Sequence, residues 1–193
     1  MIIVFEGGDQ AGKKTQSTLL VKKLKSAKVK TKLFAFPDYS TPIGKEINKY
    51  LHGKRKFAPQ VIHCLLAANR WEKIDEIKKA QEQNSIVIMN RYTESNLIYG
   101  LVNGLKSNWL ENLDKGLPNS NLVIVLDVSQ KESFNRKKSN RDKFEKNKDF
   151  SQNISKMYRK IAKKKGWKII DATQPKQQVH EDVMKIFRKK VGI

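Results

Sequence analysis

Cysteine is nearly absent from this chain of 193 residues, in which Cys64 is the only one. One cysteine cannot form an internal disulfide, and its place in a helical apolar pattern predicts a buried, unreactive thiol. Long apolar runs are also missing, because none approaches the ~20 residues needed to cross a bilayer. The apolar start at residues 1–5 has no basic leader and no cleavage pattern, so we expect a buried strand and a cytoplasmic protein without a membrane span.

Acidic residues are scarce as well, with 19 Asp and Glu against 40 Lys and Arg and a formal net charge of +21. An excess of this size attracts polyanions through the summed field of the surface. Nucleotide enzymes and nucleic-acid binders both need such cations, and a solvated lysine-rich surface gives the same composition. The balance therefore favours phosphorylated ligands, and we expect at most non-specific binding of nucleic acid.

Five short apolar runs, rich in β-branched residues, alternate with longer segments of helical spacing. The runs are Ile2–Phe5, Lys32–Phe36, Ile86–Met89, Leu122–Leu126 and Trp167–Ile170. Each reads as a strand buried on both faces, and Pro59 fits the first turn of the helical segment at residues 59–83. The alternation predicts an α/β fold with a doubly wound, five-stranded parallel sheet flanked by helices. The length fits a single domain over residues 1–193.

Ligands of doubly wound sheets bind at the carboxyl ends of the strands. Four of the five expected strands end there on a polar or turn residue, namely Glu6, Pro37, Asn90 and Asp127. We expect a structural role for Asp127.

The charged segment at about residues 134–149 follows the fourth strand and is expected to form a mobile lid, although a solvated helix face has the same composition. Three histidines lack metal-ligand spacing and are assigned no chemistry: His52, His63 and His180.

The stretch "VFEGGDQAGKKTQ" follows the first expected strand and precedes a helix that we expect to begin near Thr15. Gly7, Gly12 and Lys13 match the pattern Gly-x4-Gly-Lys. Glycines let backbone N–H groups curl around an anion, the helix start adds positive potential, and the lysine reaches the β and γ phosphates. We therefore predict a phosphate-binding loop made of Gly7, Gly8, Asp9, Gln10, Ala11, Gly12, Lys13, Lys14 and Thr15.

The position after Lys13 departs from this pattern. It usually holds Ser or Thr, whose hydroxyl binds Mg²⁺, but here it is Lys14. Thr15 follows one residue later, which rotates its side chain by ~100° around the helix. The sequence therefore predicts a weakened or rearranged metal site, and no metal ligand is assigned.

The chain resembles the thymidylate kinases from end to end. Seven segments match family segments in the family's order: "FEGGDQAGKKTQ", "FPDYSTPIGKEINKYL", "LLAANRWE", "NRYTESNLIYG", "DKGLPNSNLVIVLD", "RDKFE" and "IIDATQP". The resemblance implies the P-loop NTPase fold of nucleoside monophosphate kinases and phosphorylation of dTMP to dTDP by ATP, for dTTP synthesis. It also implies Mg²⁺ held mainly by ATP and water, and a homodimer built on residues 59–83 and 96–105.

The resemblance also implies roles for single residues. Lys13 and the loop amides would hold ATP, while Arg91 would clamp the acceptor phosphate. Arg136 and Arg141 in the lid would stabilise the transferring group, so the implied catalytic set is Lys13, Arg91, Arg136 and Arg141. Asp9 would face the sugar 3′-hydroxyl, Arg70 would read the thymine O4, and Tyr99 would exclude a ribose 2′-hydroxyl. The implied substrate set is Asp9, Phe36, Leu66, Arg70, Arg91, Ser95 and Tyr99.

Several positions differ from the family pattern. Gln10 and Tyr39 stand where the eukaryotic branch has arginines, and Leu66 stands where a phenylalanine stacks on thymine. Lys14 replaces a metal-binding hydroxyl, and Asn90 replaces an aspartate. These differences leave two alternatives open, a nucleotide-binding homologue with impaired catalysis and a nucleoside monophosphate kinase with another base preference.

Overall fold

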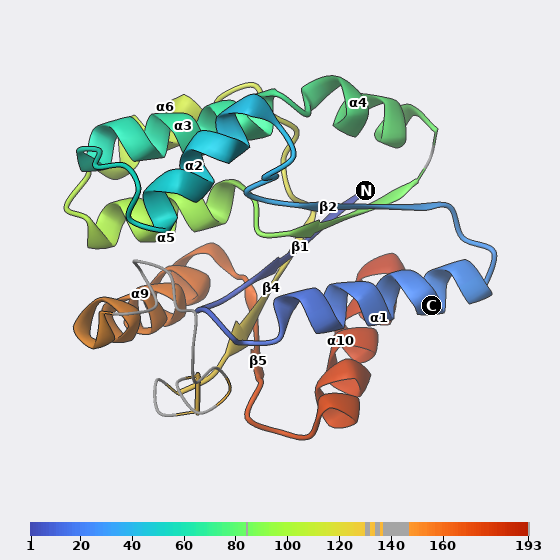
Figure 1. Cartoon of the computed structure of the whole chain (residues 1–193). Helices are drawn as coiled ribbons and strands as arrows, with labels where there is room; N and C mark the ends of the chain where they lie inside the picture. Colours follow the sequence, from blue (N-terminus) through green and yellow to red (C-terminus); the bar gives the residue numbers. More distant parts are fainter. Residues whose placement is uncertain (84, 130–131, 134–135, 137–146, 193) are drawn as a thin grey trace.

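The structure is a computed structural model that describes residues 1–83, 85–129, 132–133, 136 and 147–192. Its centre is a sheet of five parallel strands in the order β2-β3-β1-β4-β5 (Figure 1). The strands are β1 (Ile2–Glu6), β2 (Thr31–Ala35), β3 (Ile86–Asn90), β4 (Leu122–Asp127) and β5 (Lys168–Asp171). The predicted α/β sheet is confirmed, and each predicted strand lies within one residue of its observed bounds.

Helices cover both faces of this sheet (Figure 1). They are α1 (Lys13–Ser26), α2 (Pro42–Leu51), α3 (Pro59–Trp71), α4 (Ile74–Glu82), α5 (Thr93–Val102), α6 (Ser107–Leu113), α9 (Lys148–Lys165) and α10 (Lys176–Val191). Pro59 is the first residue of α3, as expected. The segment at residues 59–83 forms two helices, since α3 ends at Trp71 and α4 begins at Ile74.

The central strand β1 explains why two cores form. Successive side chains of a strand point to opposite faces. Ile2 and Val4 pack with residues of α4, α5 and α9, whereas Ile3 and Phe5 pack with residues of α1 and α10. Because all four are shielded from solvent, β1 is fixed from both sides and carries the loop that follows it to one place.

Two expectations about burial are wrong. The edge strands β2 and β5 are not buried on both faces, because Leu33 is 38% and Ile169 is 43% exposed. Each of these strands lies at an edge of the sheet and has a neighbouring strand on one side only, so part of it stays open to solvent.

Cys64 is exposed and not buried, contrary to expectation. It lies about 200° around α3 from the buried Ile62, and therefore on the opposite face of the helix.

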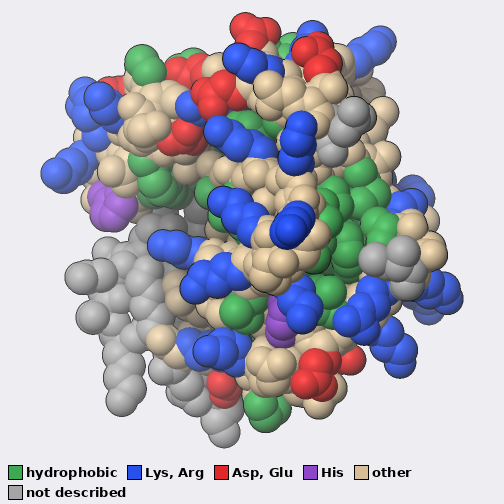
Figure 2. Space-filling view, turned by 90° about the vertical axis from the view of Figure 1, so that its right-hand side faces the viewer, with side chains coloured by type: hydrophobic (Ala, Val, Ile, Leu, Met, Phe, Trp, Pro, Cys, Tyr) green, Lys and Arg blue, Asp and Glu red, His purple; other side chains and the backbone are tan. Residues whose placement is uncertain are grey.

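Basic side chains are spread over the face of the molecule that Figure 2 shows and do not gather at one place on it. Acidic side chains on this face lie mainly near its upper and lower edges. Among the described residues, no helix is long and apolar enough to span a membrane.

Candidate active site

The loop after β1 has the backbone geometry that its glycines predict. Gly7 and Gly12 have φ angles of 132° and 92°, which side-chain-bearing residues rarely adopt. A Cβ on Gly7 would lie 2.3 Å from the carbonyl oxygen of Leu126, so the loop also needs a glycine for its contact with β4. Helix α1 begins at Lys13, two residues earlier than expected, with Gly12 as its N-cap.

The start of α1 is open to an anion. No side chain caps it, so its first N–H groups keep their capacity to bind a ligand. The ammonium of Lys13 donates to the carbonyl oxygens of Gly7 and Gly8, at 3.1 and 2.6 Å. The loop therefore joins a cation, a helix N-terminus and a curled backbone, which together favour a phosphate.

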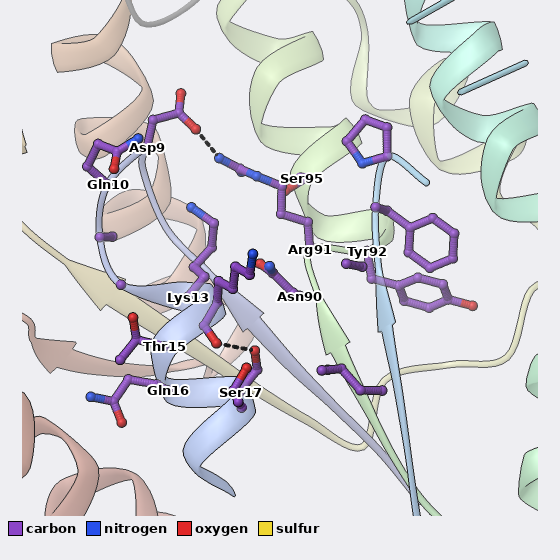
Figure 3. A pocket seen from close by; sticks show the side chains of 18 of the residues that line it. Asp9, Gln10, Lys13, Thr15, Gln16, Ser17, Asn90, Arg91, Tyr92 and Ser95 are labelled. Carbon is purple, nitrogen blue, oxygen red and sulfur yellow. Dashed lines mark hydrogen bonds and ion pairs between the residues drawn. The ribbon is translucent and has the colours of Figure 1, made fainter. Parts of the chain in front are cut away.

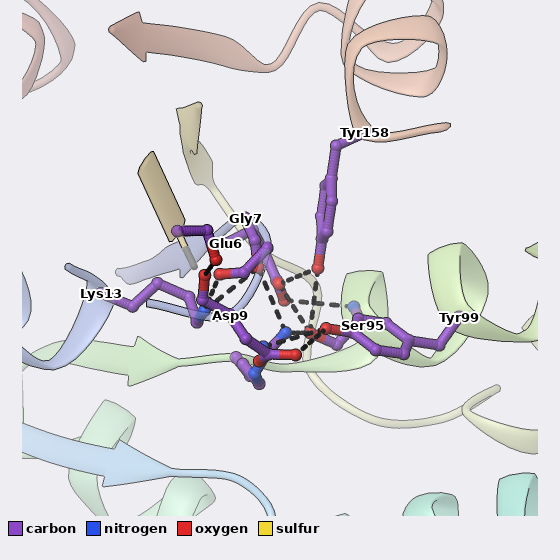
Figure 4. A network of polar contacts seen from close by, with 10 residues as sticks. Glu6, Gly7, Asp9, Lys13, Ser95, Tyr99 and Tyr158 are labelled. Atoms are coloured by element: carbon purple, nitrogen blue, oxygen red, sulfur yellow. Dashed lines mark hydrogen bonds and ion pairs between the residues drawn. The ribbon is translucent and has the colours of Figure 1, made fainter. Parts of the chain in front are cut away.

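Arg91 is the second cation of the site and follows β3. Its φ of 65° is unusual for a residue other than glycine. One terminal nitrogen donates to the Ser95 hydroxyl at 3.0 Å, and the other donates to the Tyr99 hydroxyl at 3.1 Å and pairs with Asp9 (Figure 4). Burial alone would lower the pKa of Arg91, but the groups at Tyr99 and Asp9 raise it well above its ordinary value. Arg91 is thus held as a fixed positive charge.

Asp9 is the acidic partner in this cluster. Burial alone would raise the pKa of Asp9, but the charges of Arg91 and Lys13, with hydrogen bonds from Tyr99 and Arg91, hold it below the ordinary value. The carboxylate is therefore charged at neutral pH and suits a role as acceptor and not as proton donor.

Glu6 is the last residue of β1 and is fully shielded from solvent. It accepts hydrogen bonds from the backbone N–H groups of Tyr92 and Ser95, at 2.9 and 3.1 Å. The Ser95 hydroxyl donates to it at 2.6 Å and the Tyr158 hydroxyl at 2.7 Å (Figure 4). Because Ser95 also accepts from Arg91, this carboxylate sets the position of the arginine.

A cavity of about 920 Å³ joins these groups to an apolar region. Loop side chains occupy one end, and Arg91, Ser95 and Tyr92 lie opposite them (Figure 3). Most predicted site residues line it: Asp9, Gln10, Ala11, Gly12, Lys13, Lys14, Thr15, Phe36, Leu66, Arg70, Arg91, Ser95, Tyr99 and Arg136. Gly7 and Gly8 support the loop from outside the lining. Arg141 lies outside the described residues, as does most of the predicted lid at 134–149.

Arg70 lies on the apolar side of the cavity with Phe36 and Leu66. Its side chain is 3% exposed and forms an ion pair with Asp114, whose side chain is 8% exposed. Nε and Nη2 donate to this carboxylate at distances of 2.6–2.9 Å. Within the described parts of the chain, Nη1 has no hydrogen-bond partner, so a donor remains for a ligand in the cavity.

The metal corner lacks the usual ligands. Lys14 is exposed and lines the cavity, while the Ser17 hydroxyl donates to the Lys14 carbonyl at 3.1 Å. Asn90 also lines the cavity, and its buried Oδ1 has no partner in the described structure. The described residues contain no group of three or more His, Cys, Asp or Glu that could hold a metal ion. These side chains do not fit a magnesium site of the usual P-loop kind.

Arg136 ties three segments together. Its guanidinium donates to the backbone oxygens of Gln10, at 3.3 Å, and Ala172, at 2.7 Å, and pairs with Glu132 at 3.1 Å. It therefore links the start of the predicted lid to the phosphate loop and to the residues after β5.

Sequence reasoning missed several residues of the site because their partners are distant in the chain. Tyr158 lies 152 positions from Glu6, and Asp114 lies 44 positions from Arg70. Asn96 and Gln174 also line the cavity. Both stand in segments that match the family, "NRYTESNLIYG" and "IIDATQP", but no role was expected for either residue. Glu6 gave a signal of its own, as a charged residue at the end of a buried strand.

Glu94 introduces a second buried carboxyl beside Glu6. Burial and the charge of Glu6 raise the pKa of Glu94 from 4.5 to about 7, although Ser120 donates to it at 2.5 Å. Between these pH values the folded protein binds more protons than the unfolded chain. Its free energy of unfolding therefore decreases as the pH rises through this window.

Replacing Glu94→Gln should remove this dependence, because the amide keeps the shape but cannot ionise. Calorimetry should show that the variant has a higher melting temperature than the parent at pH 8. The difference in melting temperature between pH 5.5 and pH 8 should also be smaller in the variant than in the parent. Glu82→Gln, at an exposed position, is the control and should behave as the parent does. Equal pH dependence in the parent and the Glu94 variant would contradict the assignment.

Comparison with known proteins agrees with this geometry. The family model described as "Thymidylate kinase" matches residues 5–183. The thymidylate kinase of Schizosaccharomyces pombe is 36% identical over 95% of this chain and 89% of its own length. That of Plasmodium falciparum is 37% identical over 97% and 89%. The solved structure of Candida albicans thymidylate kinase is 31% identical, with a TM-score of 0.87 over 97% of this chain and 91% of that one. The chain belongs to the thymidylate kinase family.

Proposed function

We propose that this protein transfers the γ-phosphoryl group of ATP to the 5′-phosphate of dTMP, giving dTDP for dTTP synthesis. The observation that carries this proposal is one cavity with a phosphate loop at one end and two arginines, Arg91 and Arg70, facing it. Two phosphorylated ligands could meet there. Family membership supports the same reaction and both substrates.

The reaction requires positioning and positive charge more than proton transfer. A phosphate oxygen of dTMP is already a nucleophile, so no general base is needed. Lys13 and the α1 N-terminus would hold the ATP phosphates, and Arg91 would hold the acceptor phosphate in line with them. Asp9, which stays charged, would orient Arg91 and accept a hydrogen bond from the sugar.

The lid arginines complete the proposed catalytic set. Arg136 already reaches the loop, where it binds the Gln10 carbonyl, and would exchange this contact for a phosphate oxygen. Arg141 is assigned by resemblance alone. Since Gln10 carries no charge, the lid would supply the cation that stabilises the transferring group.

The base would occupy the apolar side of the cavity. Phe36 is buried beside Tyr92, with ring centroids 6.0 Å apart, and Leu66 lines the same region. Arg70 Nη1 would donate to the thymine O4. The hydroxyl of Tyr99 is held by Arg91 and Asp9, so its ring would limit the space for a ribose 2′-hydroxyl.

Mg²⁺ would enter with ATP, held by its phosphates and by water. None of the described side chains is assigned to it, because Lys14 and Asn90 replace the usual hydroxyl and carboxylate. When bound, the ion would neutralise charge on the transferring group.

Two alternatives have specific observations in their favour. The metal corner favours a nucleotide-binding homologue with impaired catalysis, but Lys13 and Arg91 keep the geometry of a working phosphate site. Leu66 and Tyr39 favour another base preference, and the Candida albicans relative is described as having broad substrate specificity. The ordered cluster around Arg91 makes the active thymidylate kinase the better proposal.

A homodimer in the cytoplasm is part of this proposal. On α3, Val61 is 44% and Trp71 is 36% exposed, and Cys64 is exposed between them. This face suits an apolar interface. Residues 96–100 of α5 are buried within the subunit and support it less. Light scattering should give twice the chain mass of 22.3 kDa, and the single mass would contradict the dimer.

The reaction is tested by ADP release with each deoxynucleoside monophosphate in turn, at saturating ATP and Mg²⁺. We expect the highest kcat/KM for dTMP. A Lys13→Ala variant prepared in the same way controls for contaminating kinases and should release ADP far more slowly. No ADP release with dTMP would contradict the proposed reaction, and faster release with another nucleotide would contradict the base assignment alone.

The metal corner gives a second prediction. Changing Lys14→Ser and Asn90→Asp together makes the corner more negative by two charges, so a lower Mg²⁺ concentration should give half-maximal rate, with kcat preserved or raised. The two single changes should not add, because both positions face one ion. Lys22→Ser removes the same charge from an exposed position of α1 and should leave the Mg²⁺ titration unchanged. Loss of activity in the double variant, with unaltered Mg²⁺ dependence, would show that Lys14 is itself a needed cation.

A further inference from the structure

The ion pair between Arg70 and Asp114 is almost completely buried, but only one partner reaches the cavity. Arg70 lines the cavity and Asp114 does not. The carboxylate takes Nε and Nη2 together, at 2.6–2.9 Å, which fixes both the plane and the direction of the guanidinium. Asp114 therefore lies behind Arg70 and decides which of its nitrogen atoms faces a ligand.

Polar groups on two helices lie behind this ion pair. Burial raises the pKa of Asp114, and Arg70 and the Asn96 side chain on α5 oppose this shift. Asn96 Oδ1 lies 2.6 Å from Nδ1 of His63 on α3, and its amide nitrogen donates to the His63 backbone oxygen at 3.4 Å. Since an amide oxygen only accepts, His63 carries its proton on Nδ1. Nε2 of His63 then accepts from the Asn103 amide at 3.2 Å. The side chains of Asn96, His63 and Asn103 are thus oriented relative to one another.

His63 is fully shielded from solvent and stays neutral. Burial lowers the pKa of His63, the hydrogen bond with Asn96 opposes this, and the charge of Arg70 lowers the pKa again. A neutral His63 keeps its two nitrogen atoms in different roles, one donating and one accepting. The orientation of Asn96 beside the ion pair therefore stays fixed.

We propose that Asp114 is a positioning residue that determines base selectivity by leaving only Arg70 Nη1 to meet the base. Guanidinium nitrogens can only donate, so this edge accepts a pyrimidine with a carbonyl at position 4. An amino group at position 4 would set two donors against each other in a desolvated cavity. This inference rests on the proposed function and assigns the discrimination between keto and amino pyrimidines.

Fixing the guanidinium is what makes this discrimination strong. A site built to bond one polar group rejects an analogue that lacks it, because the buried partner is left unpaired. An arginine without Asp114 could turn away and leave room for the amino group. Loss of Asp114 should therefore harm binding of the keto nucleotide and relax the rejection of the amino nucleotide.

The test compares dTMP with dCMP in steady-state kinetics of the parent and Asp114→Asn. We expect the KM for dTMP to rise by about tenfold with kcat nearly unchanged, and the dTMP to dCMP ratio of kcat/KM to fall by about tenfold or more. A purely structural role would lower both substrates together and leave the ratio unchanged. Glu111→Gln, on the exposed part of α6, is the matched control and should keep the parental ratio.

A second variant keeps the test decisive if Asp114→Asn does not fold. Asp114→Glu retains the charge that compensates Arg70 but displaces the carboxylate by one methylene, so the ratio should fall while the protein still unfolds cooperatively. If the folded Asp114 variants keep the dTMP to dCMP ratio of the parent, the inference is overturned. Arg70→Ala tests the proposed role of Arg70 separately from that of Asp114. An unchanged dTMP to dCMP ratio in Arg70→Ala would overturn base reading by Arg70 itself. A changed ratio in Arg70→Ala, with none in the Asp114 variants, would overturn only the role of Asp114.

Discussion

Glu6 places a carboxylate, fully shielded from solvent, at the carboxyl end of the central strand. A buried charge is costly unless hydrogen bonds compensate it, and here four donors do so from two separate elements of the chain. The backbone of residues 92–95 comes from the start of α5, and the Tyr158 hydroxyl comes from α9. Moving any of these donors would remove one of the four hydrogen bonds that compensate the carboxylate, so their positions relative to β1 are tightly determined.

This constraint reaches the reacting groups through Ser95. Its hydroxyl lies between Glu6 and Arg91, and Arg91 in turn bonds Asp9 and Tyr99. The phosphate loop, the acceptor arginine and the helix that follows the predicted lid are therefore parts of one polar network. At the other end of the cavity, Asp114 does for Arg70 what this network does for Arg91. In both cases a buried carboxylate directs an arginine.

The sequence predicted those features that depend on local pattern. Alternation of apolar runs predicted the sheet, and the spacing of Gly7, Gly12 and Lys13 predicted the loop and its open helix start. Burial was harder to predict, because the apolar content of β2 and β5 does not show that they lie at the edges. Cys64 has apolar neighbours in sequence but lies on the outer face of α3.

The polar networks could not be predicted, because they join residues far apart in the chain. Glu6 with Tyr158, Arg70 with Asp114 and His63 with Asn96 meet only through tertiary packing. Glu94 is another case, since its raised pKa comes from burial next to Glu6. Residue type and spacing identify an arginine that can bind phosphate or base, whereas the carboxylate that directs it becomes visible only in the fold.

The central claim is that the Glu6 carboxylate sets the acceptor site, and calorimetric titration of Glu6→Gln with dTMP tests it most directly. The amide would turn an N–H group toward a donor and release Ser95, so the Kd for dTMP should rise by about tenfold or more. The Kd for ATP should change little, because the backbone of the loop and Lys13 hold its phosphates. Tyr158→Phe removes one donor and should weaken dTMP binding less. Unchanged dTMP affinity in folded Glu6→Gln would contradict the account.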